Sequence, residues 1–142
     1  MLKKSMAFNL LVFSVLFVSC VTHVETGKNG AIRANAIIKS TRHEIQAALK
    51  ETIQEELGFE VNYADSLHGN LATTYRYDNS NRIRISLNTS IRKLNENEYF
   101  ISVYKKEERL AGTPQKWLPV PSDGTLETKI IVSLENKLKK EK

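Results

Sequence analysis

The chain of 142 residues contains one cysteine, Cys20, and only three prolines. A single cysteine excludes a disulfide within the chain, and it excludes the paired thiolates of a CxxC redox motif or a structural zinc site. No HExxH, GxSxG, GxGxxG or P-loop pattern is present, so the motifs of zinc proteases, serine hydrolases and nucleotide-binding proteins are missing as well. We therefore expect no metal, no cofactor and no catalytic residues, and we interpret the protein as a non-enzyme.

Positive charge is also scarce outside the two ends of the chain. The net charge is +5 at pH 7 and the pI is near 9.3, but Lys3, Lys4 and the lysines of residues 137–142 supply most of it. The body between them is close to neutral and has no basic stripe, so we expect no nucleic-acid partner. The C-terminal lysines suit the negative end of a helix dipole, and contact with anionic lipid headgroups is the alternative.

One long apolar run occurs, and it lies at the start of the chain. Residues 6–18 are apolar except for Asn9 and Ser14, and the positively charged Lys3 and Lys4 precede them. The run is shorter than the ~20 residues that span a bilayer. Its charged start and the small residue at its end predict a secretory signal peptide over residues 1–19. A signal peptide without lipid attachment and a membrane span are the alternatives.

The end of this leader, residues 17–20, reads Phe-Val-Ser-Cys. The segment resembles the lipobox of bacterial lipoproteins. The resemblance implies that signal peptidase II cleaves before Cys20 and that the Cys20 thiol carries diacylglycerol, with further acyl chains to hold the mature protein on the membrane. It also implies delivery to the outer membrane of a Gram-negative host, because Val21 and not aspartate follows the cysteine.

The mature chain divides into a tether and one domain. Residues 20–30 are polar after the cysteine and contain two glycines, which predicts a lipidated residue followed by a tether. Residues 31–142 are enough for a single α+β domain with one core. Within that domain, residues 31–39 fit either an edge strand or the lead-in to a helix.

Two helices are predicted. Thr41 and Glu44 have the spacing of a capping box, and an apolar stripe with three- and four-residue steps follows until Gly58. A second helix begins near Ser122 or Asp123 and runs to about residue 140. Its stripe consists of Leu126, Ile130, Ile131, Leu134 and Leu138.

Between the helices, apolar and polar residues alternate as in half-buried strands. The predicted strands are Phe59–Tyr63, Ala72–Asp78, Arg82–Arg92 and Glu98–Lys105. We therefore predict a two-layer α+β sandwich in the order α-β-β-β-β-α, with a four-stranded antiparallel meander and both helices on its apolar face. From Ala72 onward this face takes the odd-numbered residues.

Two short loops set the predicted registers of the meander. A three-residue loop would pair Asp78 with Arg82, with Asn81 in the left-handed conformation. A similar loop would pair Arg92 with Glu98. Both registers place the same apolar set on one face, and this agreement supports the meander.

The even-numbered face of the meander is our first candidate for binding. It carries Arg76, Arg84, Phe100 and Tyr104, and aromatic rings beside arginines can stack on flat groups and hold carboxylates or phosphates. The alternatives are a solvated sheet face and rings covered by residues 31–39.

The second candidate is Trp117, in a segment that we predict to be a loop stiffened by prolines, Leu110–Pro121. A tryptophan there suits insertion into a partner, because tryptophan is enriched among interface hot spots. It equally suits closing the end of the domain's own core.

One loop brings acid, hydroxyl and imidazole side chains close together in sequence, at Asp65, Ser66 and His68. An envelope hydrolase that uses this loop is one alternative function, and a ligand-binding module that uses the arginine and aromatic face is the other. A polar surface loop explains the three residues without catalysis. Our interpretation is a small lipoprotein anchored in the bacterial envelope, which binds an envelope protein or assists envelope assembly.

Overall fold

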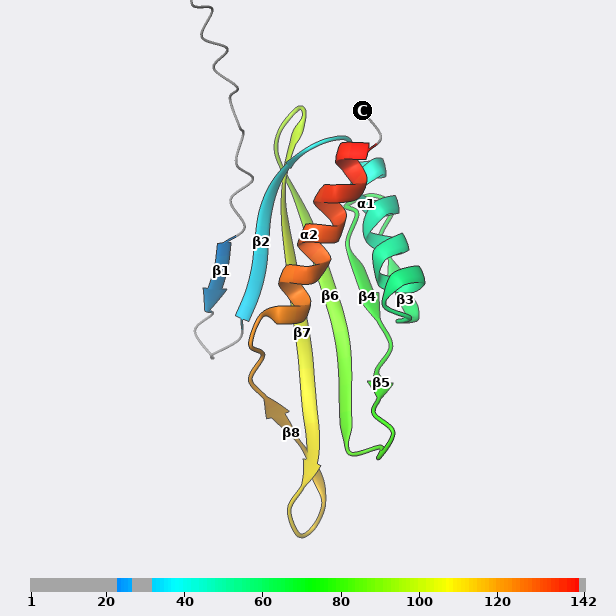
Figure 1. Cartoon of the computed structure of the whole chain (residues 1–142), viewed down its shortest axis with the longest axis vertical. Helices are drawn as coiled ribbons and strands as arrows, with labels where there is room; N and C mark the ends of the chain where they lie inside the picture. Colours follow the sequence, from blue (N-terminus) through cyan, green and yellow to red (C-terminus); the bar gives the residue numbers. More distant parts are fainter. Residues whose placement is uncertain (1–22, 27–31, 141–142) are drawn as a thin grey trace, which may run out of the picture.

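In the computed structural model, which describes residues 23–26 and 32–140, two helices lie on one face of an antiparallel sheet (Figure 1). The leader, Cys20 and part of the predicted tether lie outside these residues. No helix in the described part of the chain is long and apolar enough to cross a membrane. The prediction of an α+β fold with an antiparallel sheet and two helices is confirmed.

The sheet is larger than predicted. Within the described residues it has eight strands, ordered β1-β2-β7-β6-β4-β3, with β5 paired to β6 and β8 paired to β7. The strands are β1 (His23–Thr26), β2 (Ile32–Lys39), β3 (Val61–Ala64), β4 (Leu71–Thr73), β5 (Arg76–Tyr77), β6 (Ile83–Asn95), β7 (Glu98–Ala111) and β8 (Lys116–Val120). The four-stranded meander and the order α-β-β-β-β-α are therefore wrong.

Both helices begin and end as their sequences predict. Helix α1 (Arg42–Glu51) continues into a π-helical turn, η1 (Thr52–Glu56). At its start Thr41 Oγ1 accepts the N–H of Glu44, and the Glu44 carboxylate accepts the N–H of Thr41, so the capping box is present. Gly58 ends the segment with φ of 68°. Helix α2 (Thr125–Lys140) begins after Asp123, whose carboxylate accepts the N–H of Thr125.

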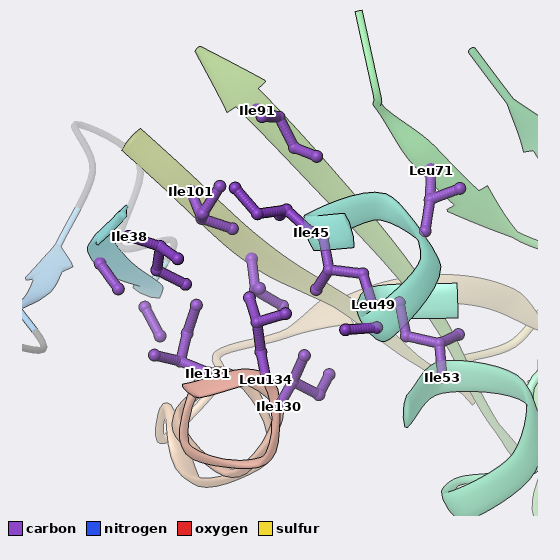
Figure 2. Packing of buried hydrophobic residues seen from close by; sticks show 14 of the residues in the cluster. Ile38, Ile45, Leu49, Ile53, Leu71, Ile91, Ile101, Ile130, Ile131 and Leu134 are labelled. Atoms are coloured by element: carbon purple, nitrogen blue, oxygen red, sulfur yellow. The ribbon is translucent and has the colours of Figure 1, made fainter. Parts of the chain in front are cut away.

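The core lies between the helices and the sheet face that carries Leu87, Ile91, Ile101 and Val103 (Figure 2). The helices contribute mainly isoleucine and leucine, among them Ile45, Leu49, Ile53, Ile130, Ile131 and Leu134, all with 0% exposure. Each such side chain stabilises the fold by roughly 1.5–3 kcal/mol through removal of apolar surface from water. The predicted odd-numbered core face of β6 and β7 is confirmed.

Strand β2 lies inside the sheet, between β1 and β7. Its residues Ala34, Ala36 and Ile38 are buried in the core, so residues 32–39 are neither an edge strand nor a helix lead-in. The edge position belongs to β1, which pairs with β2 from His23 to Thr26. Residues 23–26 of the predicted tether therefore form a strand of the sheet.

Residues 110–121 are also more regular than predicted. Strand β7 runs on to Ala111, and β8 pairs with it, from Lys116 opposite Ala111 to Val120 opposite Glu107. Pro119 is tolerated in β8 because this strand, among the described strands, pairs only with β7. Along its other edge no described strand requires a backbone N–H donor. The prolines of this segment are therefore compatible with an edge strand.

The first hairpin differs from the prediction by one residue. Tyr77 pairs with Arg84, and the N–H of Asp78 donates to the carbonyl of Ile83. The Asp78 carboxylate accepts the N–H groups of Arg82 and Ile83, which holds a loop of residues 79–82. Asn81 has φ of 53°, as predicted. A shift of one residue moves every side chain of the short strand to the other face, so Tyr77 leaves the core side.

The second hairpin differs by two residues. Ile91 pairs with Ile101 and Arg92 with Phe100, and the pairing has an irregularity between Lys93 and Asn95. Strand β6 continues three residues beyond its predicted end at Arg92, to Asn95, because the turn is formed by Glu96 and Asn97. A shift of two preserves the faces, so the predicted assignment of core and open sides survives here.

Candidate binding face of the sheet

One face of the sheet has no described helix over it, and we call it the open face. Its side chains alternate with the core residues along β2, β6 and β7, and the strand registers place them in rows across the sheet. The open face carries Arg33, Ile37, Asn88, Ser90, Arg92, Phe100, Ser102 and Tyr104. The register of β3, β4 and β6 adds Tyr63, which is 55% exposed.

Two arginines and two rings form the middle of this face. The Arg92 guanidinium carbon lies 5.1 Å from the Phe100 ring centroid, and that of Arg33 lies 5.9 Å from the Tyr104 centroid. Ile37, beside Phe100, is 48% exposed. We call these five residues the Phe100–Tyr104 patch. Neither arginine forms a salt bridge with a described side chain, so its charge is available to an anionic partner.

A second group, the distal cluster, lies where β5 and β8 join the long hairpin beyond the helices (Figure 1). It consists of Tyr75, Tyr77, Arg84, Lys106, Glu108 and Trp117. The Arg84 guanidinium carbon lies 4.2 Å from the Tyr75 ring centroid and 4.3 Å from that of Trp117. The cation is therefore held between two aromatic rings.

Both cations of the distal cluster pair with the same carboxylate, that of Glu108. Arg84 Nη2 lies 2.6 Å from Glu108 Oε2, and Lys106 Nζ lies 3.2 Å from Glu108 Oε1. Burial of Glu108 opposes its ionisation, but hydrogen bonds from Arg84 and Lys106 outweigh this and hold the pKa of the carboxyl below its ordinary value. The cluster is thus internally paired, unlike the Phe100–Tyr104 patch.

The structure places four of the five predicted binding residues on the open face. Phe100 and Tyr104 lie in one patch, and Arg84 and Trp117 lie together in the distal cluster. Trp117 does not belong to the hydrophobic core cluster, so it does not close the core. Its ring packs on the open face.

Arg76 lies on the core side of the sheet, so its predicted place on the binding face is wrong. It pairs with Ile85, a core-side residue, and its guanidinium carbon lies 3.9 Å from the Phe59 ring centroid. Arg76 also donates to the carbonyl of Leu57 at the end of η1. The one-residue shift in the hairpin register is the reason, because it exchanges the sides of Arg76 and Tyr77.

Sequence reasoning missed several residues of the open face, mainly Arg33, Ile37, Tyr63 and Tyr77. Alternation in residues 33–38 was a usable signal, since Ala34, Ala36 and Ile38 all turn inward. The register that places Tyr63 and Tyr77 depends on loop hydrogen bonds, which periodicity does not report.

In the Asp65 loop, the acid and the imidazole are in contact. Asp65 Oδ2 lies 2.6 Å from His68 Nδ1, and Asp65 Oδ1 accepts the N–H groups of Leu67 and His68. These bonds, first those from His68, lower the pKa of Asp65. The His68 side chain is 64% exposed, and among the described residues no hydrogen bond joins it to Ser66. The arrangement is that of a carboxylate that holds a turn.

The described part of the chain has no group of three or more histidine, cysteine, aspartate or glutamate side chains placed to bind a metal ion. Comparisons with protein-family profiles and with curated proteins find no match. Among solved structures, a TBP-like protein from Parabacteroides distasonis ATCC 8503 is similar, with a TM-score of 0.41 and 11% identity. The match covers 78% of this chain and 96% of that chain. A likeness of this degree says nothing about binding or activity.

Proposed function

We propose that the mature protein is a lipid-anchored, non-enzymatic module of the bacterial envelope that binds a protein partner through the open face of its sheet. The lipobox-like residues 17–20 supply the anchor, through the thiol of Cys20. The folded domain supplies the binding surface. We expect the protein in the bacterial envelope, and in the outer membrane if the host is Gram-negative.

The Phe100–Tyr104 patch is the observation that carries this proposal. Both helices pack on the other face, so the patch faces outward along three strands. Exposed Ile37 and the two rings offer apolar contact, and Arg33 and Arg92 offer cations without a described carboxylate partner. Aromatic residues and arginine are enriched at the centres of protein interfaces. A partner that presents carboxylates beside apolar groups would complement this surface.

The non-enzymatic part of the proposal is supported by the Asp65 loop. Asp65 already accepts two backbone N–H groups and contacts His68, so its carboxylate has a structural task in the turn. A hydrolase would need the imidazole within hydrogen-bond reach of a nucleophile in a sheltered site. His68 stands in solvent, and a binding function needs neither feature.

A capture experiment with the acylated protein tests the binding face. After crosslinking in the native envelope, the variant Phe100→Ala/Tyr104→Ala should lose the partner that the unaltered protein captures. The matched control is Leu67→Ala/Val132→Ala, which also removes two exposed apolar side chains, 68% and 44% exposed, from outside the sheet. Equal capture by both double variants would refute the proposed face.

A fractionation experiment tests the anchor separately. Cys20→Ala removes the thiol that would carry the lipid, so the protein should move from the membrane fraction to the soluble fraction. Continued retention in the membrane would argue for an uncleaved span and against lipid attachment.

A further inference from the structure

We infer that one end of the domain rests on the anionic surface of the bilayer, so that the strands stand away from the membrane and the distal cluster points into the compartment. This end, which we call the basic end, contains Lys39 at the end of β2, the β6–β7 turn with its flanks (residues 92–98) and the end of α2 at Lys139 and Lys140. The inference rests on lipid attachment at Cys20, as proposed above.

The position of β1 fixes which end lies near the anchor. His23 pairs with Asn35, and only three peptide links separate it from Cys20, so the lipid-bearing residue lies within ~10 Å of His23. Because β1 is antiparallel to β2, its first residue, His23, is the end of β1 that lies nearer to Lys39. The part of β2 from Asn35 to Lys39 is itself only ~13 Å long. The anchor is therefore close to the basic end.

The C-terminus of α2 reaches the same end. Gly124, just before the helix, lies against Ile32, since a Cβ at Gly124 would be 3.0 Å from Ile32 Cγ2. From there the 16 residues of α2 extend ~24 Å, which matches the ~26 Å of β2 from Ile32 to Lys39. In Figure 1 the end of α2 lies at the same end of the domain as the end of β2 and the β6–β7 turn.

Exposed cations are concentrated at this end. Lys93, Lys139 and Lys140 are exposed and form no salt bridge with a described side chain. Lys39 is paired with Glu98 at 3.4 Å, and Glu96 is the other carboxylate of the turn. Leu94, at the turn, is 43% exposed and can enter the headgroup layer. Attraction to anionic headgroups acts within ~8–10 Å, which the short link to the anchor provides.

Charge alone does not select this end. The opposite end of the long hairpin also carries exposed cations, Arg82, Arg109 and Lys116. What distinguishes the two ends is distance from the anchor, because β7 has 14 residues and so separates them by ~45 Å. A domain held at the basic end cannot bring the opposite end to the bilayer unless it lies flat.

The test uses the acylated mature protein reconstituted into vesicles of phosphatidylcholine with or without phosphatidylglycerol. Leu94→Cys introduces the one free thiol, since Cys20 is the only native cysteine and is acylated. An environment-sensitive fluorophore at position 94 should shift to the blue, and spin-labelled lipid should quench it severalfold, when phosphatidylglycerol is present. The control is Leu118→Cys on β8, where the label should stay in water.

Charge reversal completes the test. Lys93→Glu/Lys139→Glu/Lys140→Glu should abolish the quenching at position 94, whereas Arg82→Glu/Arg109→Glu/Lys116→Glu, with the same change in charge, should leave it intact. Co-flotation with the vesicles reports the anchor independently. Protein that floats but shows no quenching at position 94, or equal quenching at position 118, overturns the orientation. Protein that does not float overturns the anchor, and the orientation with it.

Discussion

Tyr77 and Trp117 lie edge to face, with ring centroids 5.9 Å apart and ring planes at 66°. Tyr77 belongs to β5, which pairs with β6, and Trp117 belongs to β8, which pairs with β7. The two rings thus meet across the long hairpin, and Arg84 lies against the indole ring. Neither ring belongs to the hydrophobic core cluster, so this contact joins β5 and β8 outside the core.

Trp117→Ala should loosen this part of the sheet and leave the core intact. Without the indole, the amides of β8 should exchange hydrogen roughly tenfold faster, because local opening there requires loss of few other contacts. Amides beside Ile101 and Ile130, which are 0% exposed, should keep their rates. Trp117→Phe, which retains a ring over Arg84, is the matched control. Uniform acceleration over the whole chain would contradict the prediction.

Acid should disturb the distal cluster through Glu108. Its pKa in the folded state lies below the unfolded value of ~4.3, so its ionised form stabilises the cluster above that pH. This contribution is lost as the pH falls through the lower, folded-state pKa. Trp117, the only tryptophan, reports the change by fluorescence. We expect an emission shift with a midpoint below the ordinary pKa of a glutamate, and this shift should be absent from Glu108→Gln. Identical titrations of the two proteins would refute the assignment.

Glu127 should be a source of instability. It is 0% exposed in the first turn of α2, and neither carboxylate oxygen has a hydrogen-bond partner. The helix dipole offsets part of the cost of burying the charge. Glu127→Gln should raise the free energy of unfolding in urea by about 1 kcal/mol, and Glu55→Gln, at an exposed position, should change it by less than about 0.5 kcal/mol. A decrease for Glu127→Gln would show that the carboxylate is stabilising.

Alanine variants of Gly58 and Gly69 distinguish the cost of a left-handed backbone from the cost of a steric clash of the new Cβ. Both glycines have positive φ, 68° and 86°. A Cβ at Gly58 would meet nothing within 4 Å, whereas one at Gly69 would lie 2.8 Å from Ile91 Cδ1. Gly58→Ala should therefore lower the free energy of unfolding by about 1 kcal/mol, from the left-handed conformation alone. Gly69→Ala should lower it further in the same urea titration, and equal losses would contradict the predicted conflict.

The helices and the core face could be predicted because their signals are local. The Thr41–Glu44 capping box and the alternation through Leu87, Ile101 and Val103 appear directly in the sequence and in the structure. Strand β2 was ambiguous because residues 31–39 are short and apolar. Strand β8 was missed because prolines disfavour inner strands, and only pairing with β7 shows that it is an edge.

Which residues lie on the binding face was harder to predict, because this depends on the pairing register of neighbouring strands. Asp78 accepts two backbone N–H groups and so adds one residue to the first hairpin loop. That addition turns Arg76 toward Phe59 and brings Tyr77 to Trp117. The alternation of residues 72–78 favours the other register, because it places Tyr75 and Tyr77 with the odd-numbered core residues.

The claim on which the account most depends is that a lipid joined to Cys20 holds this domain at the membrane. Intact-mass spectrometry of the protein purified from its native membrane measures this directly. We predict a chain that begins at residue 20 with the added mass of diacylglycerol on the cysteine. A chain that retains residues 1–19, or a mature chain with an unmodified cysteine, would contradict the account.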